Sequence, residues 1–208
     1  MAMERLRLTL KYNTVVEEVH ETLKNKVTKK RLRHSEGVLQ YSKKLCKIHG
    51  YESGACEVAA IAHDLFRDIP KNELLVLARN YEIPIMDIER KNPILLHGKI
   101  AARYLGEKFG HLEKIEEIME AVSYHTGGFP FTSYVGYITF ISDGLEYGRK
   151  FKDVESLREL SFKSLEKSFE EVLRNTLKYT LKKDLFLLPE SIIAWNSIKY
   201  TDGWSVAG

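Results

Sequence analysis

The stretch AAIAHDLFRDIP, residues Ala59 to Pro70, joins four small or apolar residues to a His-Asp pair at the point where a helix would end. A second aspartate, an arginine and a helix-breaking proline follow closely. Charged residues near a helix end are ordinary, but an adjacent His and Asp directly after a run suited to burial are less so. The stretch is therefore either the polar end of a core helix or part of a functional site.

The composition is that of a globular protein without a dominant charge. The chain has 208 residues, 44% of them hydrophobic, and its 32 Lys and Arg against 29 Asp and Glu give a formal net charge of +3. This length can bury one substantial core, and the balanced charge argues against a dedicated nucleic-acid binder. No apolar run approaches roughly 18 residues and no signal-peptide pattern begins the chain, so we expect no membrane partner. Cys46 and Cys56, outside any CxxC arrangement, are expected to be reduced thiols of a cytoplasmic protein.

Apolar residues recur with helical spacing along most of the chain. His34, Val38, Tyr41, Leu45 and Ile48, for example, share one helix face before Gly50. The same pattern predicts helices near residues 56–66, 71–81, 96–109, 115–125, 133–145, 157–182 and 189–200. No repeat, low-complexity tract or linker divides the sequence. We therefore expect an all-α fold, a single domain over residues 1–208 with roughly nine helices, in which the first dozen residues and residues 201–208 are peripheral.

Four of the seven histidines share a pattern with two aspartates. His34, His63, His97 and His125 each lie on, or end, the apolar face of a separate expected helix, and Asp143 lies in a further apolar segment. A single histidine of this kind is more often a hydrogen-bonded core residue. Burial of all of them together with Asp64 would leave many polar groups without partners unless they share a cation. Imidazole nitrogen and carboxylate oxygen together suit iron, manganese or zinc.

Short motifs in a fixed order narrow the interpretation to one family. They are RLRH (Arg31–His34), HD (His63–Asp64) with RDIP (Arg67–Pro70), LLHG (Leu95–Gly98), YHTGG (Tyr124–Gly128), ISD (Ile141–Asp143), EYGR (Glu146–Arg149), Asn175-Thr176 with Tyr179, and Leu188-Pro189. This series resembles the bacterial YqeK-type proteins of the HD superfamily, which are symmetrical diadenosine-tetraphosphate hydrolases. An HD pair alone is a weak signal, whereas the ordered series runs from about residue 24 to about residue 196.

The resemblance implies a dimeric HD-domain helical bundle with a central metal site, which holds iron, or else manganese or another divalent transition metal. It implies hydrolysis of diadenosine tetraphosphate and related dinucleoside polyphosphates into two nucleoside diphosphates. By position in the motifs, His34, His63, Asp64 and Asp143 would hold the metal. His97 and His125 would either contact phosphates or take a second ion. The implied substrate contacts are His34, Arg67, His97, His125, Thr126, Asp143, Arg149, Phe186, Leu187, Leu188, Pro189, Glu190 and Ser191.

Two residues just beyond the His-Asp pair are candidates for catalysis. Arg67 could stabilise negative charge on phosphate oxygens. Asp68 could orient or deprotonate the attacking water. An equally good interpretation of Asp68 is a cap on the helix that begins near Pro70.

Several residues depart from the family pattern at the edge of the nucleotide pocket. Arg67 stands where Lys is usual, Tyr147 replaces a Pro, and Leu188 replaces a His. None of these is among the four core metal ligands, so the departures concern substrate preference. Two alternatives stay open: an HD nucleotidase or pyrophosphohydrolase that acts on mononucleotides, and a nucleotide-binding metalloprotein without turnover.

Overall fold

The protein is described by a computed structural model, which covers the backbone of residues 2–200 and the side chains of residues 11–200. Every regular element in this range is a helix, which confirms the all-α prediction. In chain order the elements are α1 (Ala2–Lys26), α2 (Lys29–His49), α3 (Gly54–Ala62), α4 (Lys71–Asn80), α5 (Asp87–Lys91), a 3₁₀ turn (Pro93–Leu96), α6 (His97–Phe109), α7 (Ile115–Tyr124), α8 (Tyr134–Leu145), α9 (Val154–Ser161), α10 (Leu165–Lys182) and α11 (Pro189–Tyr200).

Helix α3 is the centre of the fold. It packs against α1, α2, α7 and α8, and every residue from Ala55 to Ala62 is buried. Its small side chains suit this position, because they let four neighbouring helices approach closely. The helix ends at Ala62 and not at Phe66 as its composition suggested, and His63 is its C-cap. Tight turns follow, with Leu65 N bonded to Ala62 O and Arg67 N bonded to Asp64 O at 3.0 Å each.

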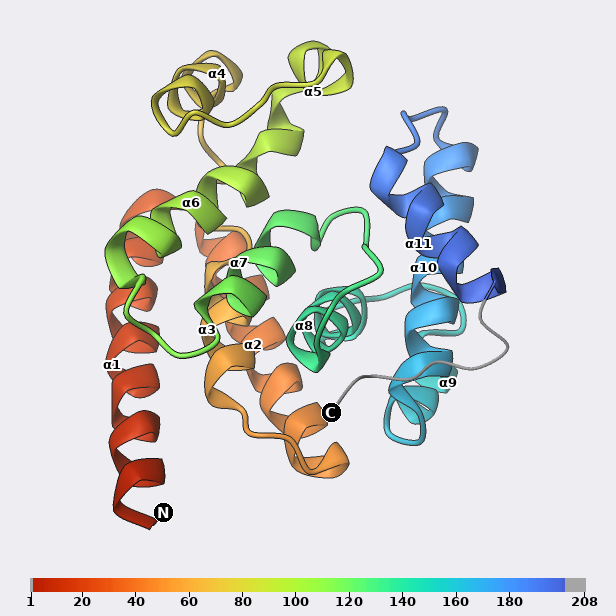
Figure 1. The fold of residues 1–208 in the computed structure, drawn as a ribbon. Coiled ribbons are helices and arrows are strands. Elements are labelled where there is room, and N and C mark those ends of the chain that lie inside the picture. Colours follow the sequence, from red (N-terminus) through yellow and green to blue (C-terminus); the bar gives the residue numbers. More distant parts are fainter. Residues whose placement is uncertain (1, 201–208) are drawn as a thin grey trace.

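Helix α3 lies within one of two groups of helices, and α8 lies between the two groups (Figure 1). Helix α8 is seen end-on near the middle of the view, with α1, α6 and α7 on one side and α9, α10 and α11 on the other. Helix α8 contacts α2, α3, α7 and α10, so it joins the two groups. Tyr12, the last of the dozen residues expected to be peripheral, is buried in the same core as α3. None of the described helices is long and apolar enough to cross a membrane.

The described range holds eleven α-helices, two more than the approximate number expected. One difference lies in residues 157–182, where the apolar pattern predicted a single long helix. The structure has two helices there, and Ser164 caps the second by accepting a hydrogen bond from Lys167 N at 3.2 Å. The helical spacing of apolar residues continues across this break, so periodicity alone does not reveal it.

Candidate metal centre

Five separate parts of the chain bring their polar residues to one point. His34 comes from α2, His63 and Asp64 from the turn after α3, His97 from the first position of α6, His125 from the end of α7 and Asp143 from α8. The ring centroids of His34 and His63 lie 5.3 Å apart, and His125 lies 4.9 Å from both His63 and His97. The sequence-based expectation that these six residues gather is met.

Gly98 allows α6 and α7 to approach closely enough for this arrangement. A Cβ atom at that position would lie 2.6 Å from Val122 O and 3.2 Å from Cε1 of His125. Real Cβ atoms do not approach a backbone oxygen that closely, so a larger residue would push the two helices apart. The glycine next to His97 therefore helps to set the distance between His97 and His125.

The carboxylate of Asp64 lies between two pairs of histidines. Its Oδ1 atom is 3.1 Å from His97 Nε2 and 3.8 Å from His125 Nε2. Its Oδ2 atom is 3.5 Å from His63 Nε2 and 3.9 Å from His34 Nε2. Asp143 lies beside the pair formed by His34 and His63. Its Oδ1 atom is 3.0 Å from His34 Nε2 and 4.0 Å from His63 Nε2.

Backbone carbonyls fix the orientation of three of the imidazole rings. The Nδ1 atoms of His63, His97 and His125 lie 2.7, 2.6 and 2.8 Å from the carbonyl oxygens of Ala60, Ile94 and Val122, respectively. A carbonyl oxygen can only accept a hydrogen bond, so each Nδ1 carries the proton. In the neutral rings each Nε2 then presents a lone pair to Asp64 and its neighbours. Metal-binding histidines commonly have this outer hydrogen bond.

The inward-facing nitrogen atoms fit a bound cation. His97 Nε2 lies 3.1 Å from His125 Nε2, and His63 Nε2 lies 3.4 Å from His34 Nε2. Two lone pairs this close to each other and to a carboxylate oxygen repel unless a positive charge lies beside them. Ligand atoms of three overlapping sets lie within 4.8 Å of one another: His34, His63 and Asp64; His63, His125 and Asp143; and Asp64, His97 and His125. This donor set of imidazole nitrogen and carboxylate oxygen fits a divalent transition metal.

The pKa values of these groups favour the same interpretation. Burial acts to raise the pKa of Asp64, but the neighbouring histidines outweigh it and hold the pKa well below its usual value. Burial likewise opposes the hydrogen bond from His34 and the charge of Arg149, which together keep the pKa of Asp143 far below normal. Burial lowers the pKa of His97 to about 4. At neutral pH the site therefore offers two ionised carboxylates and a neutral His97, the protonation states in which these groups bind metal.

His34 differs from the other three histidines in its outer partner. Its Nδ1 atom lies 3.2 Å from Oε1 of the buried Glu146. Burial acts to lower the pKa of His34, but the hydrogen bond and negative charge of Asp143 outweigh it and raise the pKa. Glu146 belongs to the EYGR motif, and no role was predicted for it from the sequence. Its place directly after the apolar segment of α8, three residues from Asp143, is the signal that was available.

Two arginines are paired with the carboxylates of the centre. Arg31 Nη1 donates to Asp64 Oδ2 at 2.7 Å. Arg149 donates twice to Asp143, from Nη2 to Oδ1 at 2.5 Å and from Nε to the backbone oxygen at 2.8 Å. Arg149 was among the expected substrate contacts, whereas the contact between Arg31 and Asp64 was not anticipated.

Arg67 and Asp68 lie in different surroundings. The guanidinium of Arg67 is partly buried, and it has no hydrogen bond or ion pair within the part of the chain that the structure describes. Burial lowers its pKa, which the charges of Asp64 and Asp68 partly offset. Asp68 Oδ2 accepts a hydrogen bond from Thr28 N at 2.8 Å, at the start of α2. The interpretation of Asp68 as a cap on the following helix is wrong, because Pro70 is the N-cap of α4 and no side chain caps that end.

The expected nucleotide segment lies partly beside His125. Ser191 Oγ donates to Gly127 O at 2.7 Å, and side-chain atoms of Leu188 and Glu190 fill the space where Gly127 would carry a Cβ. Gly127 follows Thr126, whose Oγ1 lies 3.3 Å from His125 Nε2. The part of the segment from Leu188 to Ser191 therefore reaches the histidine cluster through Gly127. Phe186 and Leu187 are exposed.

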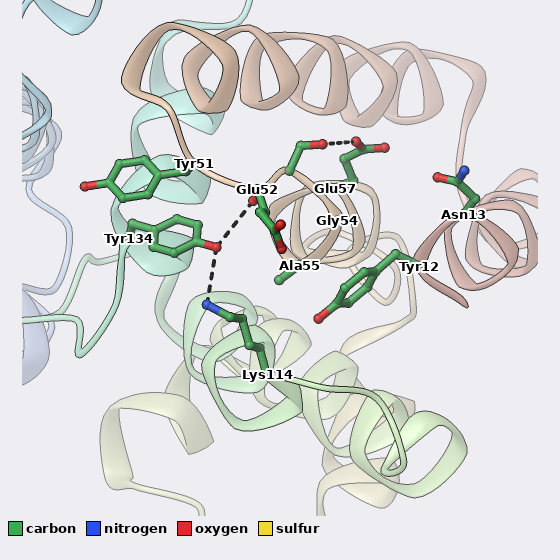
Figure 2. A pocket seen from close by; sticks show the side chains of 10 residues that line it. Tyr12, Asn13, Tyr51, Glu52, Gly54, Ala55, Glu57, Lys114 and Tyr134 are labelled. Carbon is green, nitrogen blue, oxygen red and sulfur yellow. Dashed lines mark hydrogen bonds between the residues drawn. The ribbon is translucent and has the colours of Figure 1, made fainter. Parts of the chain in front are cut away.

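A separate pocket of about 260 Å³ lies at the other end of α3 (Figure 2). Figure 2 shows Tyr51 and Tyr134 side by side, with the Lys114 ammonium pointing to the Tyr134 hydroxyl. Gly54, the first residue of α3, lines the pocket, whereas His63 follows the last residue of that helix. A nine-residue helix is about 13 Å long, so the pocket is distinct from the metal centre. None of the expected site residues lines it.

Comparisons with known proteins agree with this geometry. The family model described as the HD domain matches residues 31–174. A symmetrical bis(5'-nucleosyl)-tetraphosphatase of Halalkalibacterium halodurans is 30% identical over 86% of this chain and 94% of its own length. The Bacillus subtilis protein of the same name is 28% identical over 92% and 98%. A crystal structure from Clostridium acetobutylicum, described as a predicted HD superfamily hydrolase involved in NAD metabolism, has a TM-score of 0.80 and 28% identity over 88% of this chain and 96% of that one.

Proposed function

Since this chain belongs to the HD-domain family, and within it to the symmetrical bis(5'-nucleosyl)-tetraphosphatases, we propose that it hydrolyses diadenosine tetraphosphate and related dinucleoside polyphosphates into two nucleoside diphosphates. The observation that carries the proposal is the position of Asp64, whose two oxygens each face a pair of inward-pointing histidine nitrogens. This centre is the place where a phosphoanhydride would be cut. HD-domain phosphohydrolases require a divalent metal, and the donor atoms present here fit one.

We assign the metal to His34, His63, Asp64 and Asp143, and we propose iron as the ion. A bound cation would polarise a phosphoryl oxygen and lower the pKa of a coordinated water. The two ionised carboxylates lower the net charge of the centre, and the imidazoles leave part of the cation's charge available. Nitrogen and oxygen donors suit iron and also manganese, so the ion's identity is a matter for metal analysis.

The surrounding residues would bind and orient the polyphosphate. Arg67 is suited to this. The negative charge of Asp64 acts on its guanidinium, which has no hydrogen bond or ion pair within the described chain. Arg149 is 41% exposed, so it can meet a phosphate oxygen while it stays paired with Asp143. His97, His125 and Thr126 lie on the other side of Asp64. A phosphate oxygen beside His97 would favour the protonated form of that ring, because a neighbouring negative charge raises a histidine pKa.

We propose that Asp68 orients the attacking water. Its Oδ1 atom lies 3.7 Å from Arg31 Nε, and Arg31 is itself bonded to Asp64. Asp68 is thus linked to the centre through one arginine, while its other oxygen is held by Thr28 N. This arrangement supports a position at the edge of the centre.

The substrate is tested by identifying the products of the purified, metal-loaded protein. With diadenosine tetraphosphate we expect ADP as the sole nucleotide product, because cleavage at the central anhydride yields two equal halves. AMP together with ATP would contradict symmetrical cleavage. Efficient hydrolysis of a mononucleotide with the dinucleotide left intact would instead identify a mononucleotide phosphohydrolase. Binding of the dinucleotide with bound metal and no product would identify a sensor.

We also propose that two copies of the chain associate. The support is the exposed apolar surface of α10, α11 and their connection, where Tyr179, Leu181, Leu185, Phe186 and Ile193 are each more than half exposed. Patches of this kind commonly mark contact surfaces. Light scattering of the pure protein should give about twice the chain mass of 24.1 kDa. Leu181→Lys should shift that mass toward the monomer, and a monomeric parent protein would contradict the proposal.

The cytoplasm is the location that we propose. Cys46 and Cys56 are free thiols buried in the core, which suits a reducing compartment.

A further inference from the structure

One short turn contacts two of the four proposed metal ligands from outside. It runs from Leu145, the last residue of α8, to Arg149. Its Glu146 side chain bonds His34 Nδ1 at 3.2 Å, and its Arg149 side chain bonds Asp143 Oδ1 at 2.5 Å. The position of this turn therefore determines how His34 and Asp143 face the centre.

The turn is held by a buried arginine from another helix. Arg158 of α9 is 6% exposed, and its Nε donates to Leu145 O at 2.8 Å. Its Nη2 donates to Glu146 O at 2.7 Å and to Arg149 O at 3.1 Å. The first two carbonyls belong to the end of α8, where backbone oxygens have no partner within the helix. A positive charge is also favoured at a helix C-terminus. The guanidinium therefore stabilises the end of α8 both by hydrogen bonds to its carbonyls and by its charge.

Helix α9 is fixed in turn to the helix that carries His34. Ser161 Oγ donates to Arg158 O at 2.7 Å and lies 2.8 Å from the hydroxyl of Tyr41 on α2. Gly37, also on α2, leaves room for Glu146, because a Cβ there would lie 2.6 Å from Glu146 Oε2. Arg158, the turn and α2 thus form one connected structure around the outer side of His34.

We propose that Arg158 is a positioning residue of the metal centre, which acts by holding the turn from Leu145 to Arg149 so that Glu146 meets His34 and Arg149 meets Asp143. The proposal rests on the metal-dependent function proposed above and adds a residue outside the histidine cluster to it. Arg158 pairs with one carboxylate among the described residues, Glu155, whose side chain is 79% exposed. That exposed pair contributes little, so the carbonyl contacts are the ones that matter.

The test measures metal affinity, which needs no substrate. Arg158→Gln should release the turn and displace Glu146 and Arg149. It should therefore bind Mn²⁺ about 10- to 100-fold more weakly than the parent protein, as is typical when the outer partners of metal ligands are lost. Arg158→Lys keeps the charge but not the forked geometry, so its affinity should lie between the two. Glu155→Gln is the matched control, since it removes only the exposed partner, and its affinity should change by less than about twofold. Unchanged affinity in Arg158→Gln would overturn the proposal.

A double variant and a spectroscopic readout separate positioning from general loss of stability. Glu146→Met removes the acceptor of His34 with little change in volume. If Arg158 acts through Glu146, the double variant should bind Mn²⁺ no more weakly than the weaker single variant, and fully additive losses would contradict this. In metal-free protein, ¹H–¹⁵N NMR should show a hydrogen-bonded, slowly exchanging Nδ1 proton of His34 in the parent, because Nδ1 lies against Glu146, and this signal should be lost in Arg158→Gln. An unchanged His34 spectrum would overturn the inference even if the protein proved to have another substrate.

Discussion

Asp64→Ala is expected to remove both the bound metal and the hydrolytic activity. Among the described residues, only Asp64 has a carboxylate that faces all four histidines. Its pKa is held well below normal, so it is ionised at every pH at which the protein would work. Its loss would leave imidazoles without the central negative charge. Hydrolysis should fall by more than about 10³-fold, because water without a nearby cation keeps its bulk pKa of about 16.

Two further variants make this experiment specific. Asp64→Asn keeps the shape of the side chain and removes its charge, so it should also lose the metal if charge is what matters. Asp68→Asn is the matched control for metal content, since Asp68 lies four residues away and its carboxylate bonds Thr28 N. It should retain the ion, and its rate of hydrolysis separately tests the proposed role of Asp68. Full metal content and activity in Asp64→Ala would exclude the site assignment.

Removal of the metal from the parent protein should abolish hydrolysis and lower stability together. A ligand that binds only the folded state at about 1,000 times its dissociation constant stabilises that state by about 4 kcal/mol. We therefore expect the metal-free protein to unfold at a clearly lower urea concentration. Added Fe²⁺ or Mn²⁺ should restore both properties, whereas Ca²⁺ should not, because it prefers oxygen ligands.

The metal content of the restored protein decides the role of the second histidine pair. One ion per chain would agree with His97 and His125 as phosphate contacts. Two ions per chain, reduced to one by His97→Gln, would assign the pair to a second ion.

Asp64→Ala serves as the control for metal removal, since the stability of this variant should not respond to added metal. Undiminished hydrolysis in thoroughly chelated protein would contradict a metal-dependent reaction.

The sequence was most informative where a feature is local. The spacing of apolar residues revealed most helices, because a helix repeats every 3.6 residues regardless of its neighbours. The histidines and Asp143 stood out because each interrupts or ends an apolar face. The order of short motifs indicated the HD family, which the matching family model confirms.

Contacts between distant parts of the chain could not be read in this way. Asp68 has the right type and place for a helix cap or a base, yet it bonds the amide of Thr28, 40 residues earlier. Arg158 looks like a surface residue of an amphipathic helix, but it is buried against the end of α8. Neither partner can be inferred from spacing, because the partner depends on how two helices cross.

The sequence by itself therefore determined the class of fold, the family and the identity of the residues at the centre. Only the tertiary structure decided that Asp64 lies between two histidine pairs, that Glu146 bonds His34 and that the Arg67 guanidinium has no partner among the described residues. The physical reason is the range of the interactions. Helix formation and burial leave a periodic trace in neighbouring residues, whereas a hydrogen bond between two helices depends on a packing geometry that many residues set together.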